Sequence, residues 1–193
     1  MKYQIGVLLA LLFFFLEIMM GCVSENDEPN PDNNSWLDSY EPVHPLGDGT
    51  DDFWVDYPPG NPYYGYNITH LSWVLDSLET GCVLFVVHKT GCVTCQAQAD
   101  RAIELGQKYG SLLEFYDLDI ILGGDIEGKA YESYRYDPDG PPGYIALTGI
   151  ITRTNDNGIE RCIWHSWEGD MDYDELEGWI KDGIYYHHLS TGE

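Results

Sequence analysis

Apolar residues in the middle of the chain follow helical and strand periods in turn. A first helix is predicted between Thr69, which suits an N-cap, and Gly81, which ends it, because apolar residues recur between them at helical spacing. The continuous apolar run 82–87 predicts a strand. Residues 96–109 have the pattern of a helix, and weak alternation over 112–118 predicts a second strand.

The second half of the chain continues the alternation. Residues 126–136 predict a short helix, and the proline- and glycine-rich stretch 137–143 must be a loop. Two apolar, β-branched runs, 144–153 and 159–167, lie on either side of an Asn-Gly pair, which marks a hairpin turn. A last helix is predicted over 173–184. The predicted order is therefore helix, strand, helix, strand, helix, loop, β-hairpin and helix.

The first 22 residues have the features of a targeting segment. Lys2 supplies a positive start, and the apolar run from Ile5 to Leu16 has signal-peptide length and is too short for a comfortable membrane span. Met19-Met20-Gly21-Cys22 resembles the lipobox of prokaryotic lipoproteins, although that family usually has Leu and a small residue in the two Met positions. The resemblance implies a lipid on Cys22 and a domain anchored to the cell membrane. An uncleaved N-terminal anchor and ordinary secretion are the alternatives, and all three place the domain outside the cytoplasm, where disulfides persist.

Between this segment and the domain the composition changes twice. Residues 23–35 are polar and acidic, which predicts a disordered tether. Residues 36–68, the lead-in, combine turn-forming residues with many aromatic rings, which rarely stay in solvent. We expect an irregular lead-in that packs on the domain, with a substrate-contacting flap as the alternative. The domain is expected over 69–187, with a tail over 188–193, and Asn67 begins an N-glycosylation acceptor pattern.

Charge excludes one class of function. The chain has 193 residues, enough for one domain with a core, and a formal net charge of −24 from 33 acidic and 9 basic residues. Nucleic-acid binding needs basic patches, so this balance argues against it. We interpret the acidity as solvation of an exposed surface, with an acidic recognition site as the alternative.

The candidate chemistry lies in Cys92-Val93-Thr94-Cys95, which joins the predicted strand 82–87 to the helix 96–109. A strand that leads a C-x-x-C into a helix start is the layout of a dithiol redox site. The helix N-terminus favours a thiolate, which is the reactive species. A structural disulfide and half of a zinc site are the alternatives, but no second C-x-x-C or His partner follows at zinc-site spacing, so no metal is expected.

From about residue 69 to residue 185 the chain resembles the thioredoxin-like superfamily, and its dithiol resembles that of membrane-associated disulfide reductases. The resemblance implies an α/β fold, with a central mixed sheet between two layers of helices, and thiol–disulfide exchange with protein partners and an unknown electron donor or acceptor. No cofactor is expected. It also implies that Cys92 is the nucleophile and Cys95 the resolving thiol. The rival function is a non-catalytic binding module of the same fold with a permanent disulfide.

Further residues follow from the same resemblance. Gly140-Pro141-Pro142 resembles the family's cis-proline loop, which docks substrate; Pro142 is the candidate for the cis residue and Pro141 its rival. Val86 stands about where many thioredoxins place a buried acid, so Cys95 needs another proton partner. His88 is the nearest candidate in sequence, with a packed spacer as the alternative.

Cys82 and Cys162 remain once Cys22 is assigned to lipid. Cys82 begins one predicted strand and Cys162 lies within another. Outside the cytoplasm an even pair suggests a bond, but in this fold those strands should lie on either side of a third, which favours two buried thiols.

Overall fold

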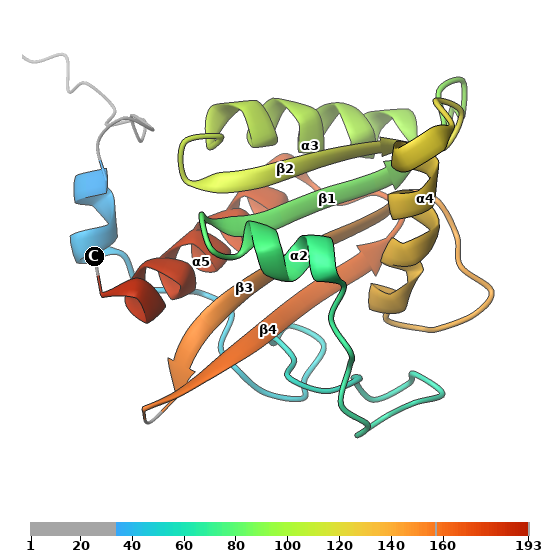
Figure 1. The fold of residues 1–193 in the computed structure, drawn as a ribbon. Coiled ribbons are helices and arrows are strands. Elements are labelled where there is room, and N and C mark those ends of the chain that lie inside the picture. Colours follow the sequence, from blue (N-terminus) through green and yellow to red (C-terminus); the bar gives the residue numbers. More distant parts are fainter. Residues whose placement is uncertain (1–33, 157, 193) are drawn as a thin grey trace, which may run out of the picture. The chain divides into compact units, whose positions relative to one another are not determined.

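The computed structural model describes residues 34–156 and 158–192 (Figure 1). The predicted signal peptide with Cys22, and the tether up to residue 33, lie outside these ranges. Asn34 and Ser35, predicted as the end of the tether, belong to the 3-10 helix η1 (Asn34–Ser39). No helix in the described ranges is both long and apolar enough to cross a membrane.

Four strands form one mixed sheet in the order β2-β1-β3-β4. Strand β1 (Cys82–His88) runs parallel to β2 (Leu113–Asp119) and antiparallel to β3 (Leu147–Asp156). β3 and β4 (Ile159–Glu168) form the predicted hairpin. The ends of β1 and β2 therefore lie at the same end of the sheet as the start of β3 and the end of β4.

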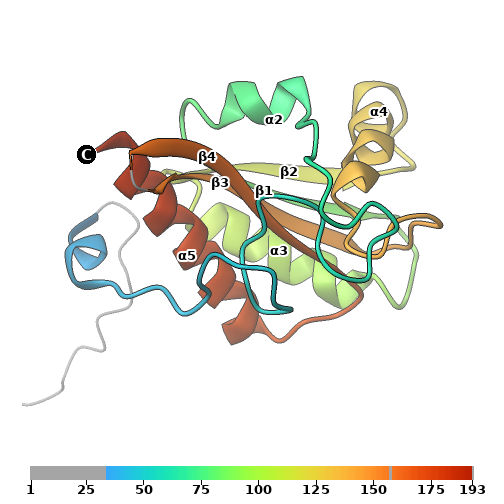
Figure 2. The same cartoon turned by 90° about the horizontal axis from the view of Figure 1, so that it is seen from below.

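Helices cover both faces of this sheet, as Figure 2 shows. α3 (Gln96–Lys108) and α5 (Tyr173–Thr191) pack on one face, and α2 (Ser72–Ser77) and α4 (Gly124–Ser133) on the other, where the 3-10 turn η2 (Tyr134–Tyr136) follows. This arrangement confirms the predicted α/β class, with a central mixed sheet between two layers of helices.

Two predicted helix boundaries were wrong. The first helix begins at Ser72 with Leu71 as its N-cap, so Thr69 caps nothing; the buried Leu71 side chain packs into the core at that point. The last helix continues past Ile184 to Thr191, through most of the predicted tail, because Tyr186 and His187 are buried. It ends at Gly192, which adopts a left-handed conformation.

Close contact between α5 and β3 fixes the layer on that face. A Cβ atom on Gly183 would lie 2.8 Å from Cγ2 of Ile150, so only glycine fits there. The Thr152 hydroxyl donates a 2.7 Å hydrogen bond to the Gly183 carbonyl, which satisfies both groups in the buried interface.

The lead-in packs along the outer edge of the sheet. Phe53 and Trp54 are buried, and the Trp54 backbone exchanges two hydrogen bonds with Trp164 of β4, at 2.8 and 2.9 Å. This bridge occupies backbone groups that would otherwise be open to a neighbouring chain.

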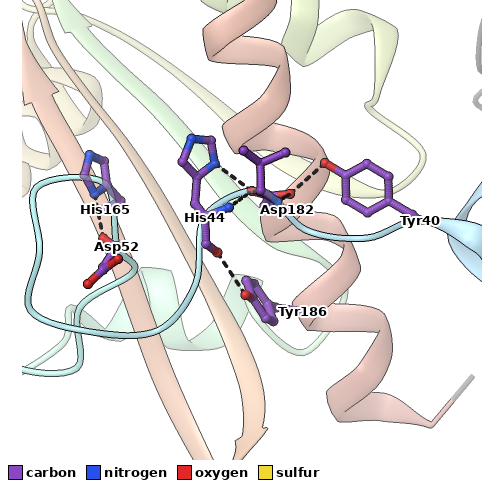
Figure 3. A network of polar contacts seen from close by, with 7 residues as sticks. Tyr40, His44, Asp52, His165, Asp182 and Tyr186 are labelled. Carbon is purple, nitrogen blue, oxygen red and sulfur yellow. Dashed lines mark hydrogen bonds and ion pairs between the residues drawn. The ribbon is translucent and has the colours of Figure 1, made fainter.

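A buried carboxylate holds the start of the lead-in to α5 (Figure 3). Asp182 is 0% exposed. Its oxygens accept hydrogen bonds from the Tyr40 hydroxyl at 2.6 Å, from the Val43 N–H at 3.1 Å and from the His44 N–H at 2.8 Å. The His44 Nδ1 lies 2.6 Å from the same carboxylate, and the Tyr186 hydroxyl donates to the His44 carbonyl. These partners compensate the cost of burying the charge.

Aromatic stacking extends this anchor. The Trp179 ring lies between two imidazoles, with centroids 3.5 Å from His44 and 3.7 Å from His165. His165 Nδ1 also lies 2.9 Å from the Asp52 carbonyl. The lead-in is therefore held to α5 and β4 at successive points.

We expect Asp182→Ala to lower the free energy of unfolding by roughly 3 to 5 kcal/mol, because it leaves the donors of Tyr40, Val43 and His44 without their buried partner. Urea unfolding measures this change. The same substitution at the exposed Asp100 is the control, and we expect it to cost less than about 1 kcal/mol. Equal losses in the two variants would contradict this role for Asp182.

Candidate redox site at the end of strand β1

The two cysteines of the C-x-x-C motif lie where β1 ends and α3 begins. Cys92 and Cys95 form a disulfide with an S–S distance of 2.04 Å. Cys92 is partly exposed, whereas Cys95 is 1% exposed. The Cys95 N–H bonds to the Cys92 carbonyl at 3.2 Å, so the motif forms a turn of its own.

The turn leads directly into α3. Cys95 is the N-cap residue of this helix, which begins at Gln96 as predicted, and Cys92 lies three residues before it. The first turn of α3 carries no acidic residue, so the partial positive charge of its N-terminus is not offset there by a neighbouring carboxylate. Gly91 allows the entry to the turn, since its φ of 86° is one that glycine adopts without strain.

Asp119, at the end of β2, anchors the loop that leads to the dithiol. Its carboxylate accepts hydrogen bonds from the Thr90 N–H at 3.1 Å, from the Thr90 hydroxyl and from the Ile121 N–H at 3.2 Å. Burial alone would raise the pKa of Asp119, but these hydrogen bonds outweigh burial and lower it. The loop position therefore depends on an ionised Asp119.

His88 is buried and its imidazole contacts the neighbouring strand. Its Nε2 lies 2.6 Å from Oδ1 of Asp117 on β2. A role for His88 as proton partner of Cys95 stays a prediction. Val86 belongs to the same apolar cluster as Cys95.

A buried polar pair that the sequence did not reveal lies on the Cys95 side of the sheet. The Gln98 side chain donates to the Thr148 hydroxyl at 3.0 Å and accepts from the Met171 N–H at 3.0 Å, and both Gln98 and Thr148 are fully buried. Gln98 follows Cys95 by about one helical turn, and Thr148 is the register partner of Val86. A glutamine in a helix and a threonine in a strand give no sequence signal for such a contact.

The proline loop is held by contacts within itself and with the lead-in. The Gly140 N–H donates to Asp137 Oδ1 at 3.0 Å, and a Cβ on Gly140 would lie 2.8 Å from Cδ of Pro62 in the lead-in. Pro141 lines a pocket together with side chains from α4 and η2. The Pro141–Pro142 peptide bond is cis. A docking role for Gly140, Pro141 and Pro142 stays a prediction.

Two residues that the sequence did not single out come directly before β3. Ile145 and Ala146 are joined by a cis peptide bond and belong to the same large apolar cluster as Cys92 and Cys95. The Ala146 carbonyl accepts a 2.8 Å hydrogen bond from the Gly169 N–H, which ties this segment to the end of β4.

Exposed apolar side chains lie in the loops at the end of the sheet where β1 and β2 finish and β3 begins. Val93, within the motif, is 91% exposed, and Ile121, Leu122 and Tyr144 are each more than half exposed. Val93 follows β1, Ile121 and Leu122 follow β2, and Tyr144 precedes β3. We call these four residues the apolar rim.

The other two cysteines of the described ranges are free thiols. Cys82 lies on β1 and Cys162 on β4. β3 lies between them, which confirms the prediction that these strands lie on either side of a third. Burial raises the pKa of both thiols, that of Cys162 to about 12. Neither therefore resembles a reactive thiol.

Two further observations bear on the alternatives. Within residues 34–156 and 158–192, no group of three or more His, Cys, Asp or Glu side chains is placed to hold a metal ion. Asn67 is exposed, as an acceptor for glycosylation would be.

Comparison of the chain with protein-family models and with curated proteins gives no match. The fold and the cysteine pair are compatible with a thioredoxin-like protein.

We expect Asp119→Asn to lower the free energy of unfolding by about 1 to 3 kcal/mol at pH 7, because an amide cannot accept all three hydrogen bonds. The folded-state pKa of Asp119 is lowered, so its contribution is complete above the usual Asp pKa of about 3.9 and is lost as pH falls through the lower folded value. The stability difference between wild type and variant should therefore shrink below about pH 4.

Urea unfolding at pH 7, 5 and 3 measures this difference. Amide hydrogen exchange adds a local readout, in which Thr90 should lose protection in Asp119→Asn and keep it in the control Asp117→Asn, two residues earlier on β2. A difference that stays constant or grows on acidification would contradict the assignment.

Proposed function

We propose that this protein is a thiol–disulfide oxidoreductase that acts on protein disulfides. The observation that carries the proposal is the asymmetry of the cysteine pair, with Cys92 partly exposed ahead of a helix N-terminus and Cys95 buried at its cap. A nucleophile needs access and a favoured thiolate, whereas a resolving thiol needs only to reach the first sulfur.

The reaction balances within the dithiol and its substrate. The Cys92 thiolate attacks one sulfur of a substrate disulfide; that S–S bond breaks, a mixed disulfide forms, and the departing substrate thiolate takes a proton. Cys95 then loses its proton and attacks the Cys92 sulfur, which releases the second substrate thiol and forms the Cys92–Cys95 disulfide. Two electrons and two protons pass to the substrate, and the reverse sequence oxidises a substrate dithiol.

The surroundings supply a place for the polypeptide that carries the disulfide. The apolar rim lies at the same end of the sheet as Cys92 and offers contacts for an extended chain. Thr94 adds a hydroxyl whose oxygen lies 3.4 Å from the Cys92 sulfur and which can donate to a thiolate there. The rival function, a binding module with a permanent disulfide, rests on the same cysteine pair and differs in whether the pair cycles.

A cycling dithiol should have a reduction potential above about −300 mV, because structural disulfides typically fall below that value. Equilibration of the protein with glutathione and dithiothreitol buffers measures it. Cys95→Ser should trap a mixed disulfide with a protein partner through Cys92, whereas the double variant Cys92→Ser/Cys95→Ser should trap none. A lower potential, marked unfolding on reduction and no trapped partner would make the binding module the better conclusion.

We further propose that the domain is tethered outside the cytoplasm through a lipid on Cys22. Support comes from the apolar run and the lipobox-like Met19-Met20-Gly21-Cys22. Mass spectrometry of the membrane fraction should find a mature chain that begins at lipidated Cys22. If Cys22→Ala is processed and retained as wild type is, the tether has another origin.

A further inference from the structure

A pocket of about 430 Å³ lies between the lead-in and the end of β4. The lead-in contributes residues 48–50, Trp54 and two prolines, β4 contributes residues 165–168, and the proline loop contributes Pro138 and Asp139. The walls therefore come from three segments that are far apart in the sequence. The anchors at Asp182 and Trp179 described above hold the lead-in part of this wall.

The charged residues that line this pocket are all acidic. Asp48, Asp139 and Glu168 line it, and none of its lining residues is Lys or Arg. His165 adds no positive charge near neutral pH, because burial lowers its pKa to about 4. Burial, repulsion from the neighbouring Asp137 carboxyl and a hydrogen bond shared with it raise the pKa of Glu168, and a cation placed beside Glu168 would favour its ionised form.

The remaining walls are aromatic and contain an unused donor. Two indole rings, those of Trp54 and Trp167, line the pocket. The Trp54 N–H is satisfied by the Gly49 carbonyl at 2.8 Å, but the buried Nε1 of Trp167 has no hydrogen-bond partner among the described residues. Indole faces attract cations, so the rings and carboxylates together match a cationic side chain.

We propose that this pocket binds a cationic side chain, arginine in preference to lysine, from the polypeptide whose disulfide the dithiol exchanges. Arginine fits better because its planar guanidinium can stack on indole and bind carboxylates at the same time. The link to disulfide exchange rests on the function proposed above, whereas binding of the side chain itself does not.

Direct contacts connect the pocket to the end of the sheet that carries the dithiol. Glu168 Oε1 accepts a 2.7 Å hydrogen bond from the Tyr144 N–H, one residue before Ile145. Trp167 is the register partner of Thr148 in β3. A polypeptide that crosses the segment from Tyr144 to Ala146 can therefore reach both Cys92 and the pocket, and the proposed substrate has a basic residue near its cysteine.

The binding test uses the oxidised full-length protein and a short peptide without cysteine, Ac-Gly-Arg-Gly-amide. Matched peptides carry lysine or citrulline in place of arginine, and citrulline keeps the shape of arginine without its charge. Calorimetry should give an affinity about tenfold higher for arginine than for citrulline, with lysine between them. Equal affinities for arginine and citrulline overturn the proposal.

Variants locate the effect. Glu168→Gln should reduce the preference for arginine over citrulline at least threefold, since the glutamine carbonyl can still accept from Tyr144 but carries no charge. Glu175→Gln on α5 removes one charge at an exposed position away from the pocket and should change the preference less than about twofold. Equal effects of the two variants mean that only the overall charge acts, and they also overturn the proposal.

A second arm separates this inference from the function on which it rests. Disulfide-bonded peptides with arginine or citrulline two residues from one cysteine are reduced by the dithiol form of the protein, and kcat/KM is compared. Faster turnover of the arginine peptide supports the whole proposal. Arginine-selective binding without turnover of either peptide retains the cation pocket and rejects the oxidoreductase. Turnover without a preference retains the oxidoreductase and rejects the pocket.

Discussion

Strand β1 buries all seven of its side chains, and the rest of the fold follows from that burial. Alternate residues face opposite sides of the sheet, so an apolar strand needs cover on both faces. α3 and α5 supply it over Leu84 and Val86, and α2 and α4 over Val83 and Phe85. The strand ends at His88, where the chain leaves the core. The dithiol begins four residues later, at the boundary between dry interior and solvent.

A second constraint, the buried charge of Asp182, accounts for the lead-in. A carboxylate with no exposed surface must find donors, and α5 alone cannot supply them. Residues 40–44 do so, and this brings the lead-in alongside β4. The same placement protects the sheet edge and builds the pocket wall at Trp54. One buried group thus connects the stability of the extension to the shape of the proposed cation pocket.

Sequence alone predicted what local patterns encode. The run 82–87, the C-x-x-C and the Asn-Gly hairpin lie where expected, since each depends on neighbouring residues. The partners of Asp182 could not be predicted, because they lie 138 to 142 positions earlier, and on a helix this aspartate looks like any solvated one. Pro141 and Pro142 could be proposed as a docking loop from the sequence because proline is an easily recognised signal. Ile145 and Ala146 carry no such signal, and only the assembled fold brings them into the same apolar cluster as the dithiol.

The acidity of the chain affects the two parts of the candidate site differently. Charges in solution are screened over about 8 to 10 Å at physiological ionic strength, so most of the net charge of −24 contributes little to the field at any one group. Near Cys92 the local field matters more, and there the helix N-terminus has no acidic side chain in its first turn. An acidic surface can thus attract cationic polypeptide without a carboxylate in the first turn of α3. The carboxylates that would oppose a thiolate are placed where they help: Asp119 receives its hydrogen bonds from the loop, and Glu168 lines the pocket.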